Sequence, residues 1–429
     1  MIGFPSRAFT AFLIAAPLAW PAQAEIVTSH ALAEFGEPEL PADFPHFPYS
    51  NPDAPKGGEL RLAMWPKFET LNRIPLGGEF ARNWSLSYDT LMTKSQDELS
   101  TYYGLLAESI TYDTDGTFIS FQLRPEARFH DGEPVEAEDI AFTFESIREH
   151  GQPFLKAQFD EVIEATVEGP HKITFTYPAG TSIDEFTKVA SLWATPKHWW
   201  EGEGRDISRD LVDPPLGSGP YKVVDLDLGR TLRYERVTDY WAADLPVNRG
   251  LWNFDAVQYD YYLDREILLE AFLGGDADFR ISRNSRNWAT RYTGPAVDGG
   301  AIIRDEVPSK NFRGIQGYYM NTRHSALSDI RVRQALQHLY PFEWVNKTVM
   351  YSLYDRMDSY FPNSDFGWSD LPLGEELDVL ERFRGRIDEA IFTEPPSLPQ
   401  NPDATISREN RRAALRLLAE AGWEVQDQR

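Results

Sequence analysis

Three short segments carry residue types that could do chemistry, but none of them forms a complete catalytic motif. His130-Asp131-Gly132 places an imidazole beside a carboxylate, which a metal site or a catalytic triad would need. Because Asp-Gly is a strong turn signal and strand-like runs flank it, this segment is predicted to be a turn. Gly217-Ser218-Gly219 has part of the spacing of a dinucleotide-binding loop, but Pro220 follows and the third glycine is missing. It is therefore interpreted as a turn between lobes.

The wider search for catalytic and metal-binding motifs also finds little. Asp276-Ala277-Asp278 has the first spacing of a calcium loop without its glycine and its glutamate, so a strand entry is predicted there. The chain has no cysteine, which excludes disulfides, thiolate zinc sites and a cysteine nucleophile. The 67 acidic residues offer too many carboxylate pairs to indicate a glycosidase. We therefore expect no enzyme, no cofactor and no metal, and keep an exported hydrolase as a weaker alternative.

Composition narrows the class of partner. The 429 residues include 67 acidic and 42 basic side chains, for a net charge of −25 at pH 7. Such a charge repels nucleic acids and anionic lipid surfaces, so neutral or cationic ligands are expected, with no nucleic acid and no membrane insertion. Length and a hydrophobic content of 42% predict two or three domains with proper cores.

The first residues have the pattern of a secretory signal peptide. Arg7 supplies the positive end, an apolar run follows from Ala8 to Trp20, and Ala22-Gln23-Ala24 fits the cleavage pattern. Residues 1–24 are therefore predicted to be a signal peptide cleaved after Ala24. Since no cysteine follows for lipidation, a free periplasmic protein is expected.

Periodicity indicates alternating strands and helices, which is typical of α/β or α+β lobes. Residues 25–55 are expected to be an irregular segment, and residues 66–80 a loop that Pro75 and two glycines keep from being helical. Strands are predicted at 59–64, 119–123, 173–177, 221–226 and 231–236. Helices are predicted at 136–149, 265–273, 329–340 and 408–421. Most of the 12 tryptophans, Trp199, Trp200 and Trp241 among them, are expected to pack in cores.

Several blocks, in order from about Gly57 to Trp423, together resemble the family 5 extracellular solute-binding proteins, the peptide-binding components of ABC importers. The blocks are Leu106-Ala107-Glu108-Ser109, Phe121-Gln122-Leu123-Arg124-Pro125, Phe129-His130-Asp131-Gly132-Glu133-Pro134, Gly217-Ser218-Gly219-Pro220-Tyr221, Asp329-Ile330-Arg331-Val332-Arg333-Gln334-Ala335-Leu336 and Ala419-Glu420-Ala421-Gly422-Trp423. Other segments, such as Phe68-Glu69-Thr70-Leu71-Asn72, look like the branch that takes up microcin C-type peptides and oligopeptides, including cell-wall peptides. One departure is Tyr340-Pro341-Phe342, where the family usually has an aspartate before the phenylalanine.

The resemblance implies an α/β, two-lobed periplasmic binding protein fold of type II (cluster C) with an extra inserted subdomain. Lobe one is expected at 25–80 plus 200–306, the inserted subdomain at 81–199, and the second lobe at 307–429. A hinge is expected near 307–316. Because relatives continue beyond the Ala-Gly-Trp block, we expect the second lobe to be truncated, with an exposed sheet edge and poor stability.

The resemblance also implies a ligand site and partners. A peptide bound through its backbone as an added strand would contact Leu76, Gly77, Gly78, Glu79 and Phe80, with Asn72 nearby. Glu79 would attract a peptide ammonium or be only a surface acid. The other expected ligand-binding residues, Arg280, Asn287 and Trp288, follow a strand entry, and Arg280 suits a carboxylate or a phosphate. The implied partners are an oligopeptide and inner-membrane permease subunits, with the receptor a monomer. Another solute (a sugar, haem or a metal chelate) and a non-transporting chaperone remain alternatives.

Overall fold

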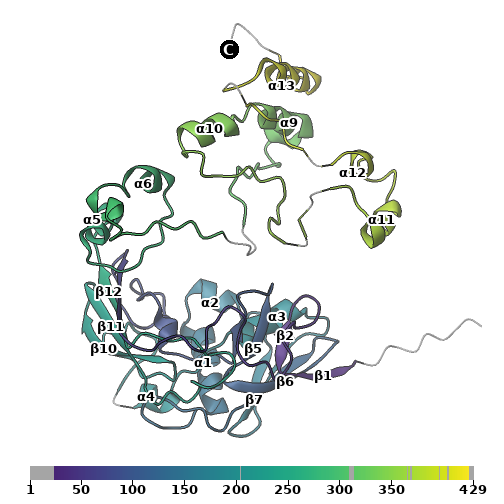
Figure 1. The fold of residues 1–429 in the computed structure, drawn as a ribbon. Helices are drawn as coiled ribbons and strands as arrows, with labels where there is room; N and C mark the ends of the chain where they lie inside the picture. The colour runs from purple at the N-terminus through teal and green to yellow at the C-terminus, as the bar shows by residue number, and fades with distance from the viewer. Residues whose placement is uncertain are drawn as a thin grey trace, which may run out of the picture.

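The computed structural model describes residues 24–202, 204–308, 314–364, 366–367, 370–395, 397–402 and 405–424. Figure 1 shows an α/β body that holds all the labelled strands, with α9 to α13 gathered on one side of it. The strands are β1 (Ile26–Ser29), β2 (Ala31–Ala33), β3 (Glu59–Met64), β4 (Met92–Lys94), β5 (Thr101–Gly104), β6 (Ala107–Asp113), β7 (Phe118–Leu123), β8 (Glu164–Val167), β9 (Lys172–Thr176), β10 (Tyr221–Asp227), β11 (Thr231–Arg236) and β12 (Ala256–Tyr261). The helices up to the middle of the chain are η1 (Trp84–Leu86), α1 (Ala137–His150), α2 (Pro153–Ala157), α3 (Ile183–Ala190), α4 (Lys197–Glu201), α5 (Arg265–Gly274), α6 (Ser285–Thr290) and α7 (Pro295–Asp298).

A five-stranded antiparallel sheet, in the order β1-β6-β7-β9-β8, forms the largest core together with α1. Alternation in β7 places Ile119, Phe121 and Leu123 inward, as predicted, and all three are buried. The predicted helix at 136–149 is confirmed as α1, which begins with a reciprocal capping box between Glu136 and Asp139. The buried Asp139 carboxylate also accepts a hydrogen bond from the Lys197 backbone, so α4 starts against the first turn of α1.

The prediction that residues 25–55 are wholly irregular is wrong at its start. β1 pairs with β6 and β2 pairs with β5, so the N-terminal segment contributes an edge strand to each of two sheets. Both strands are short, and β2 is an unbroken buried run of three residues. A period-2 pattern needs more residues than this to be recognised, so tertiary pairing supplied what the local sequence does not show.

A four-stranded sheet, in the order β10-β11-β12-β3, carries the second core. Both predicted strands after Pro220 are confirmed, and they form an antiparallel hairpin with a bulge between Val223 and Asp225. β3 pairs in parallel with β12, so a strand near residue 60 lies beside one near residue 260. The strand entry predicted at residues 276–278 extends this edge, because Phe279 bridges to Leu62 and Asp278 pairs with Arg61 at 2.8 Å.

The blocks on which the family resemblance depends meet in space. The His130 backbone donates to the Gly217 carbonyl, and its Nε2–H donates to the Gly219 carbonyl, each at 2.8 Å. A Cβ at Gly217 would lie 1.8 Å from the Ser87 carbonyl oxygen, so only glycine permits this close approach. The predicted turn at Asp131-Gly132 is confirmed, with Gly132 in the left-handed region. These blocks therefore have a structural role, because they hold together segments that are far apart in the sequence.

The described chain after residue 314 is helical, and no strand occurs among its described residues. Its helices are α8 (Ser325–Ser328), α9 (Ile330–His338), α10 (Phe342–Thr348), α11 (Gly374–Glu381), α12 (Ala390–Thr393) and α13 (Arg408–Glu420). The predicted helices at 329–340 and 408–421 are confirmed as α9 and α13. Despite the unusual Tyr340-Pro341, α10 begins directly at Phe342, because proline is well suited to the start of a helix.

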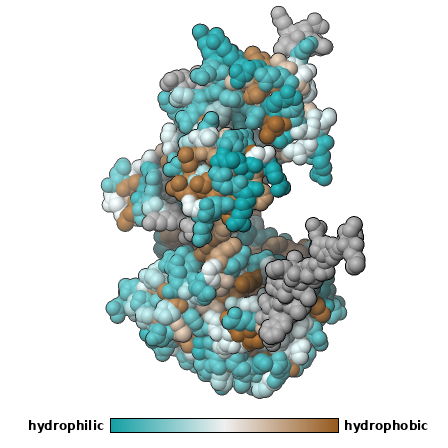
Figure 2. Space-filling model, turned by 90° about the vertical axis from the view of Figure 1, so that its right-hand side faces the viewer, coloured by the Kyte–Doolittle hydropathy of each residue, from teal (hydrophilic) through white to brown (hydrophobic). Residues whose placement is uncertain are grey.

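Two of the predicted features lie partly or wholly outside the described residues. These are residues 1–23 of the predicted signal peptide and residues 309–313 of the predicted hinge. In the described part of the chain, no helix is both long enough and apolar enough to cross a membrane. Figure 2 shows apolar residues at the surface of the α9–α13 part. Tyr318 and Tyr319, in the segment before α8, are 83% and 77% exposed.

Candidate ligand-binding site

The loop from Pro66 to Phe80 leaves the end of β3 and is held firmly in the body. Leu71 donates its backbone N–H to the Leu211 carbonyl at 2.7 Å, and Gln152 does the same to Ile74 at 2.9 Å. The buried Asn72 side chain uses both amide hydrogens, on the carbonyls of Ile207 and Arg209, each at 2.8 Å. Asn72 therefore positions the loop, and its amide hydrogens are not free for a ligand.

The two glycines of this loop lie against acidic side chains. A Cβ at Gly77 would lie 2.2 Å from the Asp210 carboxylate, and one at Gly78 would lie 2.6 Å from Glu69 Cβ. The same two acids accept hydrogen bonds from the backbone, since Asp210 bonds Gly78 at 3.3 Å and Glu69 bonds Glu79 at 3.2 Å. The predicted close approach at the glycines is therefore made by the protein's own side chains.

Glu79 stands at the surface in a weak ion pair. Its carboxylate accepts a hydrogen bond from Arg82 at 3.2 Å, and both side chains are more than 40% exposed. An exposed pair of this kind contributes less than about 1 kcal/mol, because water screens both charges. A ligand ammonium could replace Arg82 at little cost.

The outer side of the loop presents free hydrogen-bond acceptors. Within the described structure, the carbonyls of Leu76, Gly77 and Gly78 receive no hydrogen bond. Leu76 is 75% exposed, so the backbone here is open to solvent. Three successive free carbonyls on anchored backbone can accept N–H groups from an extended chain.

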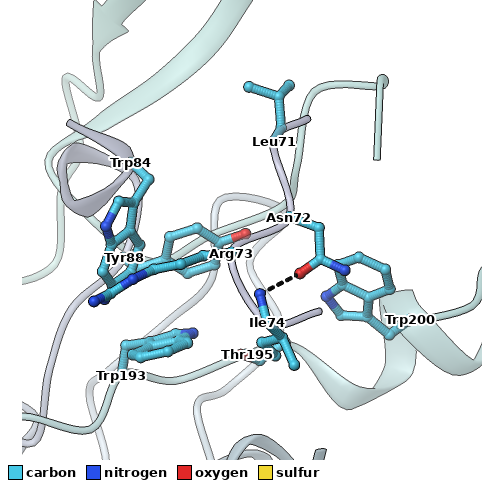
Figure 3. A pocket seen from close by; sticks show the side chains of 9 residues that line it. All are labelled: Leu71, Asn72, Arg73, Ile74, Trp84, Tyr88, Trp193, Thr195 and Trp200. Atoms are coloured by element: carbon cyan, nitrogen blue, oxygen red, sulfur yellow. Dashed lines mark hydrogen bonds between the residues drawn. The ribbon is translucent and has the colours of Figure 1, made fainter. Parts of the chain in front are cut away.

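Beneath this loop lies a recess with mixed aromatic and polar walls (Figure 3). It is lined by Leu71, Asn72, Arg73, Ile74, Trp84, Tyr88, Trp193, Thr195 and Trp200. Its free volume is about 20 Å³, room for about one water molecule. The buried Thr195 hydroxyl and the Trp200 indole N–H have no partner in the described structure, so an ordered water would satisfy them. The recess is too small for a peptide.

Arg73 extends from this recess and packs against two tryptophan rings that contact each other edge to face (Figure 3). Its guanidinium carbon lies 4.6 Å from the centre of the Trp84 ring and 5.4 Å from that of Trp193. Phe80 is the third ring, at 5.8 Å, so the arginine also touches the exposed loop. Cation–π attraction holds the guanidinium in this position.

Arg280, Asn287 and Trp288 occupy a separate place after α5. Arg280 donates to the Tyr292 hydroxyl at 2.9 Å, and Trp288 donates to Glu306 at 2.9 Å. The backbone N–H of Asn287 is the donor that the Asn284 side chain caps at the start of α6. No hydrogen bond or ion pair in the described structure joins these three residues to the loop at 72–80. Their role in binding stays a prediction.

Sequence reasoning missed Arg73, Trp84 and Trp193. Arg73 stands inside an otherwise apolar and amide stretch, which was a weak signal of a special role. The tryptophans come from η1 and from the segment after α3, and no spacing rule connects them. Among the described residues, no cluster of three or more histidine or acidic side chains could hold a metal ion.

Taken together, the sheets, the anchored loop and the helical part define the class of two-lobed periplasmic binding proteins of type II. The solved structures with this fold include the Listeria monocytogenes ABC transporter substrate-binding protein CtaP (TM-score 0.56, 20% identity, 86% of this chain and 66% of that chain). They also include NikA from Brucella suis, solved with Fe(III)-EDTA (TM-score 0.57, 19% identity, 86% of this chain and 65% of that chain). At these identities the likeness shows the fold.

The chain belongs to the bacterial extracellular solute-binding proteins, family 5, whose model matches residues 101–429. It is 37% identical to the "Probable peptide-binding protein YejA" of Agrobacterium fabrum, over 98% of this chain and 70% of that protein. It is also 37% identical to YejA of Escherichia coli, over 94% of this chain and 66% of that protein. The chain thus spans about two thirds of the length of these relatives.

Proposed function

We propose that this protein is the periplasmic receptor of an ABC importer that captures oligopeptides and delivers them to an inner-membrane permease. The observation that carries the proposal is the 37% identity to a probable peptide-binding protein along 98% of the chain. A structure with the same fold, AppA of Bacillus subtilis, was solved with a nonapeptide (TM-score 0.53, 18% identity). The narrower ligands that we propose are peptides of the microcin C and cell-wall types.

The site at 72–80 supports backbone recognition of a peptide. The free carbonyls of Leu76, Gly77 and Gly78 would accept N–H groups of an extended ligand, and Glu79 would face its ammonium. Recognition through the backbone tolerates many side chains, which suits a receptor for mixed peptides. Arg280, Asn287 and Trp288 would form a second contact area after α5.

The net charge of −25 favours cationic and neutral peptides over acidic ones. In this proposal the receptor binds and releases its ligand unchanged, as a monomer, in the periplasm after removal of residues 1–24. Domain boundaries at 25–80 plus 200–306, 81–199 and 307–429 complete the proposal.

The test is to identify the ligand that the protein carries from the cell. Mass spectrometry of material released from the purified protein should find oligopeptides, and calorimetry with those peptides should give saturable binding. Binding should survive changes to single peptide side chains. A released sugar, haem or metal chelate, or no binding heat with any peptide, would contradict the proposal.

A further inference from the structure

The Arg73 guanidinium has no counter-charge in a strongly acidic protein. Within the described structure its nitrogens make no ion pair and no hydrogen bond, although the chain carries 67 acidic residues. Burial lowers the pKa of Arg73, and no neighbouring carboxylate opposes that effect. Half-burying a cation without a partner costs free energy, whereas an apolar side chain would fill the same space without that cost.

The surroundings hold the guanidinium plane in a fixed place and leave its N–H groups available. Trp84 and Trp193 contact each other edge to face, with ring centres 4.8 Å apart, and the guanidinium packs beside this pair (Figure 3). Their own indole N–H groups have no hydrogen-bond partner among the described residues. A planar guanidinium held by rings presents paired donors that match the two oxygens of a carboxylate. Lysine could not provide that geometry.

The location connects this group to the exposed loop. Phe80, the third ring near Arg73, lies two residues after the free carbonyls of Leu76, Gly77 and Gly78. Asn72, next to Arg73, fixes the backbone through two hydrogen bonds to residues 207 and 209. A ligand lying along 76–80 therefore passes close to the guanidinium.

We propose that Arg73, packed against the ring pair of Trp84 and Trp193, binds a carboxylate of the ligand as a bidentate pair. This inference rests on the proposed function and assigns the chemistry of one end of the peptide. The carboxylate belongs either to the peptide's C-terminus or to an acidic side chain, and the experiment separates these sources.

The first measurement uses acetate and needs no peptide. The indole N–H signals of Trp84 and Trp193, assigned through Trp84→Phe and Trp193→Phe, are followed by NMR while acetate is added at constant ionic strength. Both signals should shift and saturate in the natural protein and stay in place in Arg73→Met. Methionine keeps the apolar contact with both rings, so the fold should persist. Signals that ignore acetate in the natural protein would overturn the inference.

The second measurement compares three peptides by calorimetry. One has a free C-terminus, one has the same sequence as an amide, and one is an amide that contains glutamate. The natural protein should bind the free acid about tenfold or more tighter than the plain amide, and Arg73→Met should bind both equally. Recovery of affinity in the glutamate peptide alone would assign the pair to a side-chain carboxylate. An acid preference that persists in Arg73→Met, or an acetate response without any preference for a carboxylate peptide, would overturn the assignment.

Two variants sharpen the comparison. Arg73→Lys keeps the positive charge but lacks the paired N–H donors of the guanidinium. It should retain only part of the preference for the free acid over the amide. Arg265→Met removes another arginine that lies 4.3 Å from a tryptophan ring, that of Trp65, and should change nothing. If the natural protein binds no peptide at all, the proposed function fails, while the acetate titration still decides whether Arg73 is an anion site.

Discussion

The Tyr240 hydroxyl donates a 2.6 Å hydrogen bond to Asp89 Oδ1 and so joins two segments that are 151 residues apart. Trp241 donates its indole N–H to the other oxygen of the same carboxylate at 2.8 Å. The carboxyl is buried, and burial raises its pKa to about 7, although hydrogen bonds from Tyr240, Trp241 and Ser218 oppose the rise. Because the pKa of this buried carboxyl is raised, the unfolding free energy of the protein should depend on pH.

The first prediction is that Asp89 weakens the fold as pH rises from about 4 to about 7. In that window the folded protein holds a proton on Asp89, whose ordinary pKa is 3.8, that the unfolded chain has lost. The unfolding free energy of the natural protein minus that of Asp89→Asn should therefore fall by a few kcal/mol over this range. Each tenfold difference in proton affinity between the folded and unfolded states is worth about 1.4 kcal/mol. Urea unfolding from pH 4.5 to 8 measures it. A difference that is constant with pH would contradict the prediction.

A variant of the hydrogen-bond donor to Asp89 provides the control. Tyr240→Phe removes a donor that favours the charged carboxylate, so the pKa of Asp89 should rise further. The upper end of the pH range over which the unfolding free energy falls should then move upward.

The second prediction ranks three glycine substitutions. Gly217→Ala would place a Cβ 1.8 Å from a backbone oxygen that cannot turn away, and should cost about 2–3 kcal/mol. Gly78→Ala meets the Cβ of Glu69 at 2.6 Å and should cost less, about 1–2 kcal/mol. Gly77→Ala meets only the end of the exposed Asp210 side chain, so about 1 kcal/mol or less is expected. Denaturant titration gives the order, and equal costs would show that the close approaches are absent.

The third prediction concerns Glu79 and rests on the proposed function. Glu79→Gln removes a half-exposed charge and should weaken peptides with a free N-terminus about three- to fivefold. N-acetylated peptides should bind both proteins equally, because they carry no terminal ammonium. Glu108→Gln, at another exposed acid, is the matched control. An equal loss for acetylated peptides would remove the assigned role.

The fourth prediction concerns the contact between α9 and α13. The buried Asn410 accepts a 2.7 Å hydrogen bond from His338 and donates to the Gln400 carbonyl and to Asn401. Asn410→Ala leaves His338 Nδ1 and the Gln400 carbonyl without this partner and should cost about 2–3 kcal/mol. The rate of backbone amide hydrogen exchange should rise in both α9 and α13. The exposed Arg412→Ala should leave exchange unchanged, and protection in Asn410→Ala equal to that of the natural protein would contradict the prediction.

The elements that could be predicted from the sequence are those with a long local pattern. α1, α9 and α13 repeat apolar residues at helical spacing, and β7, β10 and β11 alternate, so local physics was sufficient. β1 and β2 were missed because their stability comes from pairing with β6 and β5, far along the chain. Pattern reasoning cannot detect a strand of three or four residues whose partner is unknown.

The candidate site was predictable only in part. Gly77 and Gly78 indicate a close contact at the backbone, but the sequence does not indicate that Asp210 and Glu69 make this contact. Asn72 was predicted to lie near the ligand, and its hydrogen bonds to residues 207 and 209 could not be foreseen. The packing of Arg73 against Trp84 and Trp193 depends on three segments that meet only in the folded chain.

The parallel register of Glu59 with Ala256 also has a kinetic consequence. A chain made from its N-terminus holds β3 without its partner β12 until the five-stranded sheet, α1 and the β10–β11 hairpin have been synthesised. Contacts that close so long a loop form late, whereas the neighbouring pairs β6–β7 and β10–β11 form early. The four-stranded sheet is therefore completed late in folding, and until then β3, an amphipathic strand that carries Glu59 and Arg61, lacks its partner.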